Sequence, residues 1–133
     1  MMMMHYPFTV AALLLALLVY VWATYRVGRA RATFGVKAPA CSGDENFERV
    51  FRAQQNTVEQ MIIFLPLLAV AAWLWGDRGA ALYGLVWSLG RILYVEGYAR
   101  EAGKRELGFM LSGLLSLLVL VGLLGTLVWK HIA

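Results

Sequence analysis

Four apolar stretches alternate with polar segments along the chain and define the predicted elements. They cover residues 8–25, 61–75, 80–90 and 108–129. The first and the last are long enough to cross the hydrocarbon of a bilayer as helices, which takes about 20 residues. The other two are shorter, so each helix must include polar neighbours to complete a crossing. The pattern predicts one domain, residues 1–133, that is an all-α integral membrane four-helix bundle in up-down-up-down order, with helices at about residues 6–28, 45–75, 79–106 and 108–131.

Turn-forming residues separate these helices. Gly28, Gly35 and Pro39 interrupt the segment that follows the first helix. Asp44 is the expected N-cap of the second helix, because an aspartate side chain accepts hydrogen bonds from free backbone N–H groups. Residues 76–79, with the sequence GDRG, predict a tight turn between the second and third helices.

The second predicted helix begins with a polar segment, residues 47–60, that runs directly into its apolar stretch. At about 100° per residue, Arg49, Arg52, Asn56 and Glu59 fall within about 80° of one another. Two cations, an amide and a carboxylate therefore share one face at a membrane boundary. Such a face indicates a site for a small polar molecule that carries charges of both signs.

The third predicted helix carries a second polar stripe. It consists of residues with spacings of 3, 4, 3 and 4, namely Arg91, Tyr94, Tyr98, Glu101 and Arg105. They share one face if the helix is continuous as far as residue 105. Charged groups at this depth are costly and indicate function or pairing between helices. The two stripes are expected to meet at one end of the bundle and to enclose a cationic pocket lined by tyrosines. Glu96 lies on the opposite side of this helix and is expected to pair with another helix.

Composition narrows the possible classes of protein. The chain is 61% hydrophobic with a mean hydropathy of +0.66, more apolar surface than a soluble domain of 133 residues could bury. The formal charge is +4, but the cations cluster beside the apolar stretches, which favours membrane orientation over nucleic-acid binding. The single cysteine, Cys41, is interpreted as an idle thiol, and no spacing of metal ligands is visible, so no metal is expected.

The distribution of cations predicts the orientation. Nine Lys or Arg lie in or beside the two polar regions that join the first helix to the second and the third helix to the fourth. The opposite side carries only Arg78 and Lys130. The positive-inside rule therefore predicts that both of these polar regions are cytoplasmic and that both termini lie on the opposite side. In the fourth helix, Gly108, Ser112 and Ser116 recur every four residues, a spacing that permits close helix contact.

The two stripes resemble those of the MAPEG family, the membrane-associated proteins of eicosanoid and glutathione metabolism. The motifs that carry the resemblance are RAQ-x-N-x-x-E, starting at Arg52, and Y-x-x-x-Y with an arginine downstream, starting at Tyr94. The resemblance covers about residues 8–130. It implies a four-helix protomer assembled as a homotrimer, with glutathione bound as co-substrate between neighbouring subunits on the cytoplasmic side.

The resemblance also implies roles for individual residues. The residues that correspond to glutathione ligands are Arg52, Asn56, Glu59, Tyr94 and Tyr98, with Arg31 and Gln54 reaching the tripeptide from the adjacent protomer. Gln54 lies on the opposite face of its helix from Asn56, as such sharing requires. Arg105 matches the arginine that activates the thiol. Gln60 is a departure, because the leukotriene-synthase member has a tyrosine there, so the substrate preference of that member is not carried over.

The chemistry of the residues agrees with these roles. Glutathione has two carboxylates and an ammonium group, which suit arginines and a glutamate. A guanidinium beside the thiol favours the reactive thiolate. The resulting hypothesis is a membrane-bound glutathione transferase, a detoxification enzyme that conjugates glutathione to lipophilic electrophiles arriving from the membrane lipid, with reduction of lipid hydroperoxides as a side activity. Two alternatives stay open: a non-catalytic lipid-binding or scaffold protein of the same fold, and a small transporter or channel subunit that uses Arg91 and Glu96.

Overall fold

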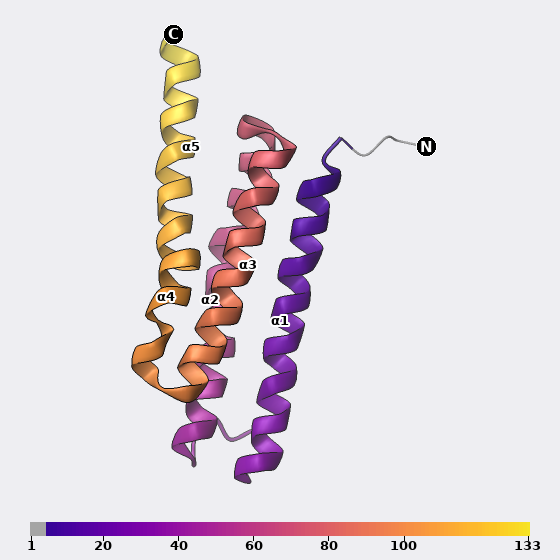
Figure 1. Ribbon diagram of the computed structural model, residues 1–133, viewed down its shortest axis with the longest axis vertical. Helices are drawn as coiled ribbons and strands as arrows, with labels where there is room; N and C mark the ends of the chain where they lie inside the picture. The colour runs from indigo at the N-terminus through magenta and orange to yellow at the C-terminus, as the bar shows by residue number, and fades with distance from the viewer. Residues whose placement is uncertain (1–4) are drawn as a thin grey trace.

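Four helical rods stand side by side in the computed structural model, which describes residues 5–133 (Figure 1). The first three rods are α1 (Pro7–Phe34), α2 (Glu45–Trp75) and α3 (Asp77–Arg100). The fourth rod is built of consecutive segments, namely the 3₁₀ turn η1 (Ala102–Arg105), α4 (Glu106–Phe109), the π-helical turn η2 (Met110–Leu114) and α5 (Leu115–Ile132). Successive rods run in opposite directions, and both ends of the chain lie at one end of the bundle. The predicted all-α, up-down-up-down four-helix bundle is confirmed.

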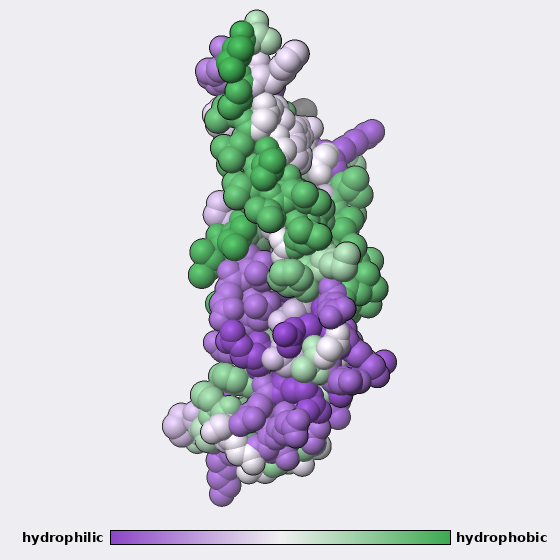
Figure 2. All heavy atoms as spheres, turned by 90° about the vertical axis from the view of Figure 1, so that its left-hand side faces the viewer, coloured by the Kyte–Doolittle hydropathy of each residue, from purple (hydrophilic) through white to green (hydrophobic). Residues whose placement is uncertain are grey.

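Length and composition identify the bundle as an integral membrane protein. Three segments, Pro7–Phe34, Glu45–Trp75 and Ala102–Ile132, are long and apolar enough to cross a membrane. On the face that Figure 2 shows, apolar side chains gather on the half that carries the termini, and polar side chains gather on the half that carries the connections from α1 to α2 and from α3 to the fourth rod. The third helix, α3, packs against α1 and α2, which accommodates the charges that it brings into the bundle.

Aromatic stacking and short polar contacts hold the apolar half of the core together. The rings of Phe64 on α2 and Trp87 on α3 stack with centroids 4.0 Å apart and an angle of 15° between their planes. Tyr83 packs against Phe64 and shares a hydrogen bond of 2.7 Å with Ser116 of the fourth rod. A buried hydroxyl pair of this kind is satisfied without water, which a membrane-spanning core requires.

At the end of the bundle opposite the termini, called the loop end below, the helices differ in part from their predicted bounds. The first helix continues to Phe34 instead of ending near residue 28, and Gly35 ends it in the left-handed conformation, with a φ of 69° and its N–H bonded to the carbonyl of Arg31. Asp44 is the N-cap of α2, as predicted, and accepts the N–H of Phe47 at 3.0 Å. Glycine adopts the left-handed region at little cost, which explains why the chain reverses at residue 35.

The prediction that the third helix continues to about residue 106 is wrong. The helix α3 ends at Arg100, and Glu101 is extended, with φ −161° and ψ 137°. The chain then folds back through η1 across the end of α3. Glycines make this return possible: a Cβ at Gly97 would overlap the carbonyl of Lys104, and a Cβ at Gly108 would overlap the backbone of Tyr94.

We expect Gly108→Ala to lower the free energy of unfolding by about 1–3 kcal/mol, because the new methyl group would be forced into backbone that cannot move away. Gly125→Ala is the matched control in the same rod, since nothing lies within 4 Å of a Cβ at that position. Its effect should be neutral or slightly stabilising through helix propensity. Thermal unfolding in detergent micelles measures both, and equal stability of the two variants would contradict the close approach.

Candidate functional site

The polar stripe of α2 is held together by its own side chains. Nη1 of Arg52 donates to Oε1 of Glu59 at 3.2 Å, and Nδ2 of Asn56 donates to Oε2 of the same carboxylate at 3.3 Å. The side chains of Arg52 and Glu59 are 55% and 52% exposed, so this part of the stripe faces outward from the single chain. The cation, the carboxylate and the amide that the sequence placed on one face are thus in direct contact.

Arg91 connects this stripe to α3 and to the fourth rod. Its side chain is fully buried, and Nη2 donates to Oδ1 of Asn56 at 3.0 Å and to Oγ1 of Thr57 at 2.9 Å. Nη1 donates to Oγ of Ser112 at 3.2 Å, and that hydroxyl donates to the carbonyl of Gly108. Among residues 5–133, no carboxylate forms a salt bridge with Arg91. A buried guanidinium bound by neutral oxygens keeps its charge available to a nearby anion.

The tyrosines extend the same network toward the loops. The guanidinium of Arg91 lies 4.1 Å from the ring centroid of Tyr94, and the rings of Tyr94 and Tyr98 are 5.7 Å apart. The guanidinium of Arg105 lies 4.9 Å from the ring of Tyr98. Contacts at these distances are favourable cation–π and aromatic pairs. The structure therefore joins the two predicted stripes into one polar network, whose members are Arg52, Asn56, Glu59, Arg91, Tyr94, Tyr98 and Arg105.

Arg105 reaches the network by a different route from the one that the spacing predicted. It does not belong to a continuous third helix but to η1, and the return of the chain at Glu101 carries it back over Tyr98. Glu101 was predicted on the same face and is not part of the network, because it is exposed and pairs with Lys104 at 3.7 Å. A cavity of about 410 Å³ opens beside Arg105, and it is lined also by Glu106, Phe109 and Met110.

Three other residues that were predicted to belong to the site lie away from the network of their own chain. Gln54 is buried against α1, where Nε2 lies 3.4 Å from the hydroxyl of Tyr20 and 3.3 Å from that of Thr24. Arg31 donates to the carbonyl of Ala40 at 2.7 Å. Arg49, predicted on the stripe of α2, contacts two side chains one turn earlier, Glu45 and Asn46, and not the members of the network.

Glu96, near the C-terminal end of α3, has the partner expected of it. Glu96 forms an ion pair with Arg26 of α1, which confirms the prediction that it pairs between helices.

Spacing did not identify Thr57 or Ser112 as members of the site. Thr57 lies next to Asn56 but outside the stripe, and Ser112 was noted only for its small size. Both accept hydrogen bonds from Arg91 because the helices approach closely, and a sequence pattern within one helix does not reveal that approach.

Comparisons with known proteins agree with this geometry. Residues 9–129 match the model of the MAPEG family. The chain is 47% identical over 116 residues to an uncharacterised protein of Synechocystis, which covers 87% of this chain and 85% of that protein. It is 50% identical over 101 residues to microsomal glutathione S-transferase 2 of Homo sapiens, covering 75% and 69% of the two chains. It is 41% identical over 116 residues to leukotriene C4 synthase of Rattus norvegicus, covering 86% and 77%. The matched residues include the whole polar network, and the chain belongs to the MAPEG family.

Proposed function

We propose that this protein is a membrane-bound glutathione transferase that conjugates the thiolate of glutathione to hydrophobic electrophiles. At the family level the relatives support a glutathione-using membrane enzyme. The observation that carries the proposal is the continuous network from Arg52 to Arg105, which combines exposed charges of both signs with a cation beside a cavity lined by Phe109 and Met110.

The network suits a tripeptide with two carboxylates and one ammonium group. Arg52 offers a guanidinium to a carboxylate, Glu59 offers a carboxylate to the ammonium, and Asn56 is oriented by Arg91 to bind a peptide group. Tyr94 and Tyr98 then lie between these ligands and Arg105. We assign the cysteine part of glutathione to this stretch, because it leads from the polar ligands to the thiol-activating cation.

The reaction follows from the position of Arg105. A free thiol has a pKa of about 8.5 and is mostly protonated at neutral pH. The guanidinium of Arg105 favours the thiolate, which attacks an electrophilic carbon so that an S–C bond forms and the leaving group departs. The cavity beside Arg105 places Phe109 and Met110 where an apolar electrophile from the bilayer can bind. Reduction of a lipid hydroperoxide is a side activity of the same thiolate: two glutathiones are oxidised to the disulfide, and the hydroperoxide is reduced to an alcohol and water.

The proposal includes a homotrimer with sites between subunits and with the loop end in the cytoplasm. Two observations support the shared site: the outward-facing position of Arg52 and Glu59, and the separation of Arg31 and Gln54 from the network of their own chain. A neighbouring subunit would bring its own Arg31 to the open stripe, and its Gln54 would turn from Tyr20 and Thr24 of α1 to reach the tripeptide. The excess of cations at the loop end supports the cytoplasmic orientation.

The test of this function is turnover of a chromogenic aryl halide with glutathione by the protein purified in detergent. We expect conjugation that saturates with glutathione, together with stabilisation of the protein by glutathione against thermal unfolding. If glutathione neither supports turnover nor stabilises the protein, the proposal is overturned and the non-catalytic alternative of the same fold is favoured.

We expect Arg52→Gln to weaken glutathione binding by about tenfold, because a charge-assisted contact worth about 1.5 kcal/mol or more is lost. Arg49→Gln is the control: it removes a cation one turn away that faces Glu45 and Asn46, and it should change the affinity by less than about twofold. Calorimetric titration with glutathione measures both variants. Equal losses in the two would mean that general positive charge, and not the network, holds the tripeptide.

A further inference from the structure

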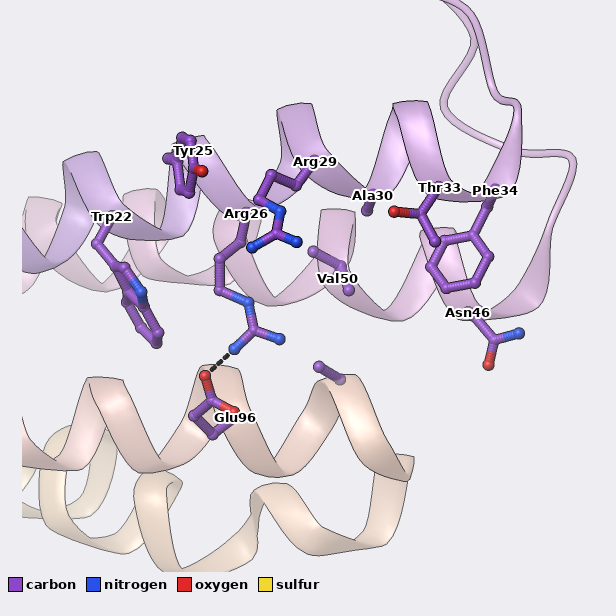
Figure 3. Close-up of a pocket in the computed structure, with 11 residues that line it drawn as sticks. Trp22, Tyr25, Arg26, Arg29, Ala30, Thr33, Phe34, Asn46, Val50 and Glu96 are labelled. Atoms are coloured by element: carbon purple, nitrogen blue, oxygen red, sulfur yellow. Dashed lines mark hydrogen bonds and ion pairs between the residues drawn. The ribbon is translucent and has the colours of Figure 1, made fainter.

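A second cavity, of about 480 Å³, lies between α1 and α3 near the loop end of the bundle (Figure 3). Its walls are formed by the last three turns of α1, the first turns of α2 and the end of α3. The polar side chains that line it are Arg26, Arg29, Thr33, Asn46 and Glu96. The proposed conjugation reaction uses none of them.

This cavity faces away from the proposed glutathione site on both helices. At about 100° per residue, Arg26 and Arg29 lie about 140–160° around α1 from Thr24, which contacts Gln54. On α3, Glu96 lies about 160° from Tyr98. A glutathione between subunits and a ligand in this cavity would therefore occupy opposite flanks of the chain.

The cavity carries more positive than negative charge. Arg26 reaches across to pair with Glu96, as the dashed line in Figure 3 shows, and its guanidinium lies 5.4 Å from the ring of Trp22. Arg29 forms no salt bridge within residues 5–133, although it lines the same cavity. Arg100 and Arg29 both lie within electrostatic range of Arg26. Two arginines and one carboxylate thus line the cavity, so the site is complementary to an anion.

The surroundings of the cavity indicate where that anion comes from. Tyr25, which is 62% exposed, and Phe34 flank the cavity, as aromatic side chains do at the level of lipid headgroups. Toward the apolar half, α1 continues with the exposed side chains of Leu18 and Val21. A ligand with an anionic head in the cavity and apolar chains along α1 fits both parts. Basic pockets between transmembrane helices bind the headgroups of anionic lipids in this way.

We propose that this cavity binds the phosphate group of an anionic phospholipid. Arg29 is the main ligand, because it has no ion-pair partner of its own in the described chain, and Arg26 is the second, sharing its charge between Glu96 and the phosphate. Thr33 and Asn46 supply a hydroxyl and an amide for the remaining oxygens. The acyl chains lie against the exposed apolar side chains of α1. This site is independent of the proposed transferase activity.

The test measures lipid affinity directly. Phosphatidylglycerol is titrated into the full chain held in zwitterionic detergent, and bound lipid is counted by native mass spectrometry. We expect Arg29→Gln to reduce the affinity about fivefold or more, which corresponds to the loss of one basic contact at a membrane surface. Lys37→Gln is the matched control, because it removes one exposed cation from the same end without touching the cavity, and it should change the affinity by less than about twofold. Phosphatidylcholine should show no difference among the three proteins.

One more variant and one competing ligand ensure that each result either supports or contradicts the lipid site. Arg29→Lys should retain binding within about twofold, and it replaces Arg29→Gln as the informative variant if the glutamine protein does not fold. Equal losses in Arg29→Gln and Lys37→Gln, or no preference for phosphatidylglycerol over phosphatidylcholine, would overturn the proposal in favour of diffuse surface charge. Inorganic phosphate at millimolar concentration should not displace the lipid. If it does, the ligand is a soluble phosphate compound, and the assignment to a lipid is overturned.

Discussion

Replacing Arg105 by alanine is expected to lower the rate of conjugation by about 100-fold, since removing one electrostatic group that stabilises a developing or reacting charge has effects of this size. The guanidinium lies 4.9 Å from the ring of Tyr98 and beside the cavity lined by Phe109 and Met110. The binding of glutathione should change much less than the rate, because we assign its charged ends to Arg52 and Glu59. Stopped-flow or steady-state turnover with an aryl halide measures the effect.

The pH profile of this variant separates activation of the thiol from a general loss of structure. In the proposed mechanism, the cation lowers the pKa of bound glutathione below the value of about 8.5 for a free thiol. Without it, the thiolate forms only at higher pH, so the deficit of Arg105→Ala should shrink as the pH rises. Lys104→Ala is the control, since Lys104 is exposed and pairs with Glu101 outside the network. A deficit that is independent of pH, or one that Lys104→Ala shares, would contradict the assigned role.

The second large effect is expected at Arg91. We expect Arg91→Ala to lower the free energy of unfolding by about 2–4 kcal/mol, because it leaves a cavity in a fully buried position and removes the hydrogen bonds that join three rods. Thermal unfolding in detergent measures this loss. It should be accompanied by a weaker affinity for glutathione, because Asn56 loses the donor that orients its amide.

Arg91→Met distinguishes packing from hydrogen bonding. Methionine fills most of the volume without a charge, so the stability should return to within about 1–2 kcal/mol of wild type. The affinity for glutathione should remain reduced, since Asn56 and Tyr94 still lack their partner. A methionine variant with wild-type affinity would show that Arg91 acts only as a filler of space and does not position the site.

The network explains why some predictions from helical spacing succeed and others fail. Arg52, Asn56 and Glu59 lie on one continuous helix, and there the spacing of about 3.6 residues per turn fixes which side chains are neighbours. Arg49 lies on the same helix, but its guanidinium contacts Glu45 and Asn46 one turn earlier and does not join the network. Angular position on a helix wheel gives the direction of a side chain but not its partner.

The amino-acid sequence by itself determined the class of this protein and one half of its site. Apolar stretches of bilayer length predict membrane helices because backbone groups in hydrocarbon must bond internally, and the 3.6-residue period places the polar stripe of α2 on one face. Only the tertiary structure decided how the second half is assembled. The return of the chain after Glu101, permitted by Gly97 and Gly108, brings Arg105 over Tyr98, and close contact of the rods gives Arg91 its acceptors on α2 and in the fourth rod. Such contacts depend on how closely separate helices approach, and the pattern within any one helix does not contain that distance.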